Sequence, residues 1–142
     1  MWFRRDLRLH DHGGLAAAGT DRVVALFVLD PELIRSAGPV RLAHLYRCLR
    51  GLDRSIRNRG GAGLLVRVGD PAVEVPAVAA AHDVQRVLVS GEYTPYGLRR
   101  DAAVAATLAQ RGVRMSSTDT PYLHSPGAVV KGDGTPFSVF TP

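Results

Sequence analysis

Short apolar segments alternate along the sequence with stretches that can form helices, and this alternation restricts the fold more than any other feature. Five apolar segments are predicted to be β-strands, at residues 1–3, 23–29, 64–68, 86–90 and 113–117. The second of them is apolar almost without a break, which is typical of a strand buried on both faces. The pattern predicts an α/β fold, a Rossmann-like, doubly wound sheet of five parallel strands in the order 3-2-1-4-5.

Three of the intervening stretches have clear helical features. The longest predicted helix spans residues 40–58, where apolar side chains recur at three- and four-residue steps: Leu42, Leu45, Leu49, Leu52 and Ile56. We expect this stripe to face the sheet. A row of arginines on another side of the same helix is more typical of a solvated face than of a binding surface. Further helices are predicted over residues 71–82 and 97–111.

Length and composition indicate one globular domain. The chain has 142 residues, of which 46% are hydrophobic and 22% charged, and this balance suits one folded core. We predict that residues 1–119 form the domain. Residues 120–142 contain four prolines and three glycines without a helical period, so they are expected to be the extended start of an interdomain linker.

Several kinds of protein are excluded by what the sequence lacks. A single cysteine, Cys48, cannot form a disulfide within the chain, and no cysteine and histidine residues have zinc-ligand spacing. No apolar run reaches the roughly 18 residues that cross a bilayer, so we expect a cytoplasmic protein with no membrane contact. The formal net charge of +5 permits binding to polyanions without establishing it.

Ligands of doubly wound sheets bind beyond the carboxyl ends of the strands, where the strand order reverses. The candidate positions are therefore the turns at residues 4–12, 27–30 and 91–97. None of these turns contains a recognisable catalytic triad. The first turn carries four charges between Arg4 and Arg8, and it fits a surface ion-pair cluster and an interface about equally well.

Four motifs, in the same order and at similar spacing, resemble the DNA photolyase and cryptochrome family. The first is Trp2-Phe3-Arg4-Arg5-Asp6-Leu7-Arg8-Leu9-His10-Asp11, which is similar to the opening signature of that family. The others are residues 26–31, residues 95–101 and the closing pair of segments, 123–127 with 137–142. The resemblance therefore covers essentially the whole chain.

The resemblance implies the N-terminal antenna-binding domain of a deoxyribodipyrimidine photolyase. In that family the antenna chromophore collects light and passes excitation energy to FAD in a following helical domain, and the flavin repairs cyclobutane pyrimidine dimers in DNA. The parent protein would be a carbon–carbon lyase. This chain would be a portion of it that is not catalytic alone, with the missing FAD domain and, through the full-length protein, damaged DNA as its partners.

The resemblance also favours a deazaflavin as the antenna. Phe27, Arg41 and Glu92 coincide with positions that the deazaflavin-binding branch uses: Phe27 as a wall, Arg41 facing an ionised ring hydroxyl, and Glu92 accepting hydrogen bonds. Thr94 stands where that branch would have a second acid. Folate is disfavoured because the folate-binding branch has an amide and an acid near residues 96 and 97. Phe27 also fits a plain core position.

Two other functions stay open at this level. A cryptochrome-type photoreceptor would use the same domain without DNA repair, and the residues that separate the two functions lie in the flavin domain. A stand-alone nucleotide-binding module would need a glycine-rich phosphate loop after a strand. The glycines at Gly13, Gly14, Gly91 and Gly97 are too sparse for such a loop.

Overall fold

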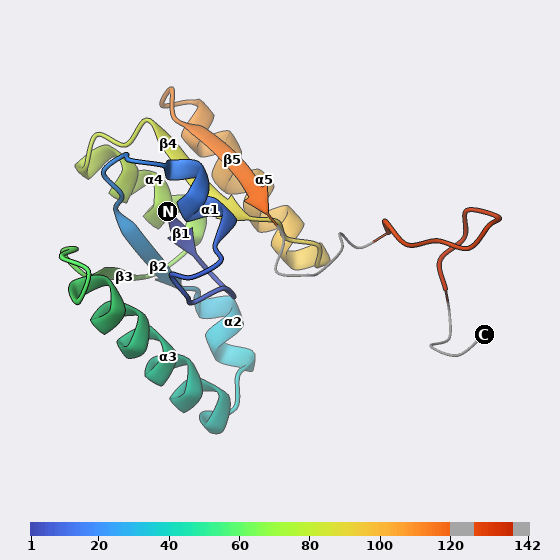
Figure 1. Cartoon of the computed structure of the whole chain (residues 1–142), viewed down its shortest axis with the longest axis horizontal. Coiled ribbons are helices and arrows are strands. Elements are labelled where there is room, and N and C mark those ends of the chain that lie inside the picture. The colour runs from blue at the N-terminus through green and yellow to red at the C-terminus, as the bar shows by residue number, and fades with distance from the viewer. Residues whose placement is uncertain (120–126, 138–142) are drawn as a thin grey trace.

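Strands are separated by helices in the computed structural model, which describes residues 1–119 and 127–137 (Figure 1). Their order is β1 (Trp2–Phe3), α1 (Gly13–Ala18), β2 (Ala25–Leu29), α2 (Pro31–Ser36), α3 (Pro39–Arg57), β3 (Leu64–Val68), α4 (Pro71–Ala81), β4 (Arg86–Ser90), α5 (Pro95–Ala109) and β5 (Arg114–Asp119). The predicted α/β class is confirmed, and each predicted strand has its counterpart within a few residues.

The strands pair in parallel as two groups within the described residues. One group has the order β1-β2-β3 and the other pairs β4 with β5. β1 lies beside β4, yet no ladder joins them, so the single five-stranded sheet stays a prediction. The missing ladder between β1 and β4 has a physical reason in the shortness of β1. Only Trp2 and Phe3 have strand geometry, and both pair with β2.

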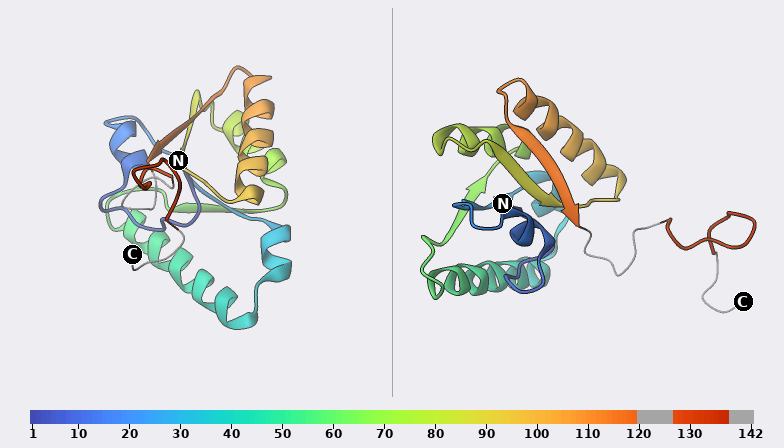
Figure 2. Two further views of the ribbon diagram at one scale, coloured as in Figure 1. Left: turned by 90° about the vertical axis from the view of Figure 1, so that its right-hand side faces the viewer. Right: turned by 45° about the horizontal axis from the view of Figure 1, so that its top comes forward.

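Helices cover both faces of the strands (Figure 2). Successive side chains of a strand point to opposite faces. Leu26 and Val28 pack in one core with α4 and α5, and Phe27 packs in the other with α3. The same alternation places Trp2 in the first core and Phe3 in the second. This two-sided burial explains the nearly unbroken apolar run that β2 shows in the sequence.

Helix α3 begins and ends one residue earlier than predicted. Its apolar stripe faces the sheet as expected, with Leu49 and Leu52 buried. The arginines on its other side are exposed: Arg41, Arg47, Arg50, Arg54 and Arg57. The chain leaves the helix through Gly60, whose φ of 82° lies in the left-handed region that glycine adopts at little cost.

Two short helices, α1 and α2, and the true start of α5 were not predicted. His12 accepts a hydrogen bond from the backbone N–H of Leu15 and caps α1, which opens with two glycines, poor helix formers. Asp30 caps α2 in the same way. Thr94 caps α5, and the helix therefore starts at Pro95, two residues before the predicted start.

Part of the predicted linker can be described. Within residues 127–137, an antiparallel bridge joins Val130 to Pro136 around a turn. Residues 120–126 and 138–142, which include most of the closing motif, lie outside the described residues. In the described part of the chain, no helix is both long enough and apolar enough to cross a membrane.

Candidate functional site

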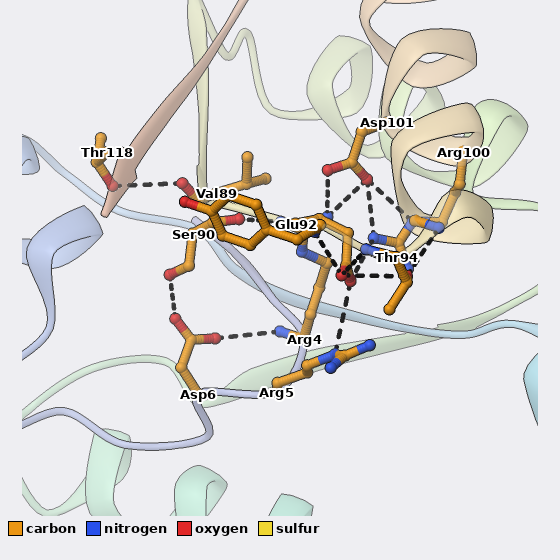
Figure 3. Close-up of polar contacts among 12 residues, drawn as sticks. Arg4, Arg5, Asp6, Val89, Ser90, Glu92, Thr94, Arg100, Asp101 and Thr118 are labelled. Carbon is orange, nitrogen blue, oxygen red and sulfur yellow. Dashed lines mark hydrogen bonds and ion pairs between the residues drawn. The ribbon is translucent and has the colours of Figure 1, made fainter. Parts of the chain in front are cut away.

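Charged and polar side chains gather where the carboxyl ends of β1 and β4 meet the first turns of α5 (Figure 3). We name this group the carboxyl-edge cluster. It consists of Arg4, Asp6, Ser90, Glu92, Arg100 and Asp101. The end of a parallel sheet is the usual place for a ligand in this class of fold.

Arg4 links three elements at this edge. Its guanidinium donates to both carboxylate oxygens of Asp101 on α5, at 2.6 Å each, and to the backbone carbonyl oxygen of Ser90 at the end of β4. It also lies 5.0 Å from the ring centre of the buried Trp2, a favourable cation–π contact. Burial lowers the pKa of Arg4, and the carboxylate of Asp101 opposes that shift.

Asp6 is a buried acid on the other side of the cluster. The hydroxyl of Ser90 donates to its Oδ2, and Nε2 of His12 lies 2.9 Å from the same oxygen, though without the alignment of a hydrogen bond. Burial acts to raise the pKa of Asp6, but contacts with His12 and Ser90 outweigh it and hold the pKa well below its usual range. Asp6 therefore carries its charge at neutral pH.

Arg100 extends the cluster towards the end of β2. Its guanidinium lies 5.1 Å from the ring centre of Trp2 and 5.8 Å from that of Tyr96. The hydroxyl of Tyr96 donates to the carboxylate of Asp30, which follows β2. Burial, then the hydrogen bond to Asp30 and the charge of Asp30, raise the pKa of Tyr96, so the phenol keeps its proton and the link persists at neutral pH.

Glu92 has one occupied carboxylate oxygen and one that is open. Oε1 accepts hydrogen bonds from the backbone N–H groups of Tyr93 and Thr94, at 2.9 and 3.1 Å, and from the Thr94 hydroxyl. Within the described residues, Oε2 meets only the guanidinium groups of Arg5 and Arg100, at 3.5 and 3.7 Å. Burial acts to raise the pKa of Glu92, yet these hydrogen bonds and the charge of Arg5 bring it below its ordinary value.

A small hollow of about 200 Å³ opens at this cluster. It is lined by Arg4, Arg5, Asp6, Ser90, Gly91 and Glu92. A larger hollow of about 280 Å³ lies at the opposite ends of the strands, where its lining is almost entirely apolar. Polar groups that orient a ligand converge only on the smaller one among the described residues, so the smaller hollow is the better candidate site.

The structure separates the three residues that the sequence singled out. Glu92 lines the hollow, and its side chain is only 7% exposed. Phe27 is 8% exposed and packs in the core beneath α3. Arg41 is exposed in the first turn of α3 and forms no hydrogen bond or ion pair within the described part of the chain. Neither Phe27 nor Arg41 lines the hollow.

The sequence placed Arg4, Asp6 and Glu92 in candidate turns but did not predict their contacts. Arg4 and Asp6 do not form a purely surface ion-pair cluster, because both turn inward and bind residues far along the chain. Arg4 and Asp101 are 97 positions apart, and no local pattern marks such a pair. The one available signal was position, because Arg4 and Asp6 follow directly after a predicted strand.

Comparison with known proteins gives the family. The family model described as DNA photolyase matches residues 1–142, the whole chain. The chain belongs to the DNA photolyase family. A deoxyribodipyrimidine photo-lyase of a Synechococcus species is 39% identical over 146 residues, which cover 100% of the chain and 30% of that protein. Cryptochrome-1 of Arabidopsis thaliana is 33% identical, with 99% and 21% covered.

Solved structures of this family share the fold. A class III photolyase from Agrobacterium tumefaciens superposes with a TM-score of 0.85 at 28% identity, covering 99% of the chain and 29% of that photolyase. An archaeal photolyase from Sulfolobus tokodaii, crystallised with two FAD molecules, gives a TM-score of 0.75 at 29% identity over 83% of the chain. The chain thus spans about a third of the length of the photo-lyases that it matches.

Proposed function

We propose that the chain is the light-harvesting domain of a deoxyribodipyrimidine photo-lyase. The observation that carries this proposal is the match to photo-lyases over the full length of the chain. In the complete protein, the domain would hold an antenna chromophore that passes excitation energy to FAD in a helical domain. The flavin would then drive the light-dependent repair of cyclobutane pyrimidine dimers in DNA.

A deazaflavin is the proposed antenna. Its ring carries hydrogen-bond donors and a weakly acidic hydroxyl, and the largely buried Glu92 offers the acceptor Oε2, which accepts no hydrogen bond from the described residues, at the hollow. Arg41 is proposed to face the ionised hydroxyl from the start of α3, and Phe27 to support the apolar side of the site from the core. Of these three contacts, the one to Glu92 has the most direct structural support.

The helical FAD domain is the proposed partner of this edge. The 200 Å³ of the hollow includes the open space above its mouth, and the volume that the protein encloses is only about 10 Å³, roughly the room that one water molecule needs. A flat chromophore would therefore be covered only in part by this chain. We propose that the helical domain supplies the remaining wall of the site.

The order of the strands belongs to the same proposal. We propose that β1 and β4 are neighbours in one sheet with the order 3-2-1-4-5. The two strands lie side by side, and Arg4 connects the end of β1 to the carbonyl oxygen of Ser90 at the end of β4. The reversal of strand order would then fall at the hollow, where doubly wound sheets bind their ligands.

Titration with a deazaflavin tests the assignment. Binding should be saturable, change the absorption spectrum of the ligand, and alter the fluorescence of Trp2, the only tryptophan, which lies beside the cluster. Glu92→Ala should weaken binding by about tenfold to a hundredfold, the range for a hydrogen bond to a charged group. Asp21→Ala, at an exposed acid, is the control and should bind normally.

The same titration includes a folate and FAD as competing antennas. FAD is included because the Sulfolobus photolyase was crystallised with two FAD molecules and interpreted as having a novel light-harvesting cofactor. If either compound binds more tightly than the deazaflavin, that compound becomes the proposed antenna in its place. An unchanged spectrum with all three at high excess would count against the site at Glu92, although it would leave the family unaffected.

A cryptochrome-type photoreceptor is the second candidate, because the chain is also similar to cryptochrome-1 over nearly its whole length. The two functions differ in one activity. A complete photo-lyase carrying this domain splits the thymine dimers of irradiated DNA into separate thymines under blue light, whereas a photoreceptor without repair activity leaves the dimers in place.

A further inference from the structure

We propose that Gly97 is a positioning residue that keeps the carboxylate of Glu92 in the hollow, and that it thereby selects a hydrogen-bond donor, rather than an anion, as ligand. The choice of ligand rests on the proposed function, whereas the coupling between the two residues does not. Gly97 lies in the first turn of α5 and is buried.

The side chain of Glu92 occupies the space that a side chain at Gly97 would need. A methyl group on Gly97 would overlap Cγ of Glu92 and lie 2.8 Å from Oε2. Because the overlap is at Cγ, close to the backbone, a small movement of the carboxylate cannot relieve it. Any larger residue at position 97 must therefore push the Glu92 side chain out of its place.

The backbone of α5 does not itself require glycine at this position. The φ of Gly97 is outside the left-handed region, and glycine is among the least favourable residues within a helix. Gly51, in the middle of α3, offers a comparison, because a Cβ atom built there meets nothing within 4 Å. The close approach of Glu92 is what distinguishes Gly97 from Gly51.

Hydrogen bonds tie the two residues together through Thr94. The N–H of Gly97 donates to Oγ1 of Thr94 at 3.1 Å, and the Thr94 hydroxyl donates to Oε1 of Glu92 at 3.1 Å. These contacts and the two backbone N–H groups saturate Oε1. They leave Oε2 as the acceptor beside the hollow, already desolvated and oriented before a ligand arrives.

The position of Glu92 also determines the charge of the hollow. With its carboxylate in place, Arg5 and Arg100 both face an acid. Without it, Arg5 would lose its acidic neighbour, and the site would favour a phosphate or carboxylate over a neutral donor. Gly97 therefore fixes both the acceptor and the charge that an incoming molecule meets.

A double-mutant cycle in the full chain tests the coupling by thermal unfolding. Gly97→Ala should lower the Tm of the parent chain, because it expels Glu92 and breaks the bonds to Oε1. In the Glu92→Ala background, the same substitution should raise the Tm, because alanine favours a helix and the overlap is gone. Gly51→Ala is the matched control and should raise the Tm in both backgrounds. A rise for Gly97→Ala in the parent chain would overturn the coupling.

Ligand binding tests the selection. Gly97→Ala should weaken deazaflavin binding by about tenfold or more, as Glu92→Ala does, and the double variant should lose no further affinity. It should also bind inorganic phosphate more tightly than the parent chain. Normal deazaflavin binding by Gly97→Ala would overturn the selection. If the parent chain binds no deazaflavin, the proposed antenna and its selection fail together, while the thermal cycle still decides the coupling.

Discussion

Asp6 keeps a negative charge at a position that is only 6% exposed. It does so because the hydroxyl of Ser90 and the ring of His12 face its carboxylate. Nδ1 of His12 accepts the N–H of Leu15, so the ring proton belongs on Nε2, the nitrogen beside Asp6. Single side chains thus connect the turn after β1 with both β4 and α1.

The low pKa of Asp6 predicts a loss of stability in acid. Because its pKa in the folded chain is below the ordinary value of 3.8, the stabilisation is complete well above pH 3.8 and is lost progressively as the pH falls below about 5. Asp6→Asn should lower the free energy of unfolding at pH 7 by about 3 kcal/mol. Urea unfolding between pH 7 and pH 3 should show the gap to the parent chain closing at low pH. A gap of constant size would contradict the assigned charge, and Asp21→Asn, at an exposed acid, is the control.

The sequence identified Glu92 as a candidate site residue but did not predict which residues surround it. Position after a strand and resemblance to a family identified Glu92, and both are visible in a linear sequence. Its immediate neighbour in space, Gly97, was weighed only as a weak candidate for a phosphate loop. Packing between Gly97 and Glu92 depends on where α5 begins, and that start is fixed by the Thr94 cap.

Helices and strands that have a strong local sequence pattern could be predicted. Elements with only a weak pattern could not. The apolar stripe of α3 is visible in the sequence as a periodicity, and β2 and β4 are visible as short apolar runs. Asp30-Pro31 opens α2 with the same pairing of an aspartate cap and a proline that Asp70-Pro71 forms at the start of α4, yet α2 has only six residues and none of them is buried. An element that short has no periodicity to detect.

The pairing of β1 with β4 is a prediction at this scale. NMR spectra should show cross-strand contacts between the backbone protons of residues 2–3 and those of residues 87–89, in the parallel sense. Contacts between β1 and β2, which pair Trp2 with Leu26 and Phe3 with Phe27, provide the internal control. If only the control contacts are observed, the strands form two sheets and the order 3-2-1-4-5 is wrong.

At the scale of the whole molecule, two cores share the same strands. Leu108 of α5 packs on one face and Leu52 of α3 on the other, while β2 and β4 contribute side chains to both. Damage to one core should therefore be transmitted to the other through these strands, so that the described domain unfolds as one unit.

Alanine substitutions in the two cores test this unity. Leu108→Ala and Leu52→Ala should each lower the free energy of unfolding by about 2–5 kcal/mol. Trp2, the only tryptophan, lies in the core that contains Leu108. Its fluorescence should nevertheless report the same shifted midpoint as far-ultraviolet circular dichroism in both variants. A fluorescence midpoint that ignores Leu52→Ala would mean that the two faces unfold separately.

The short strand β1 lies between the two cores, and this has a consequence for synthesis on the ribosome. Trp2 and Phe3 are translated well before Val87, Leu88 and Leu108, with which they share the two cores. The nascent chain must therefore carry two large aromatic side chains that are incompletely covered until β4 and α5 have been made, and this domain becomes native-like only after α5 has emerged. A slow stretch of translation before that point would prolong the interval in which chaperones are needed.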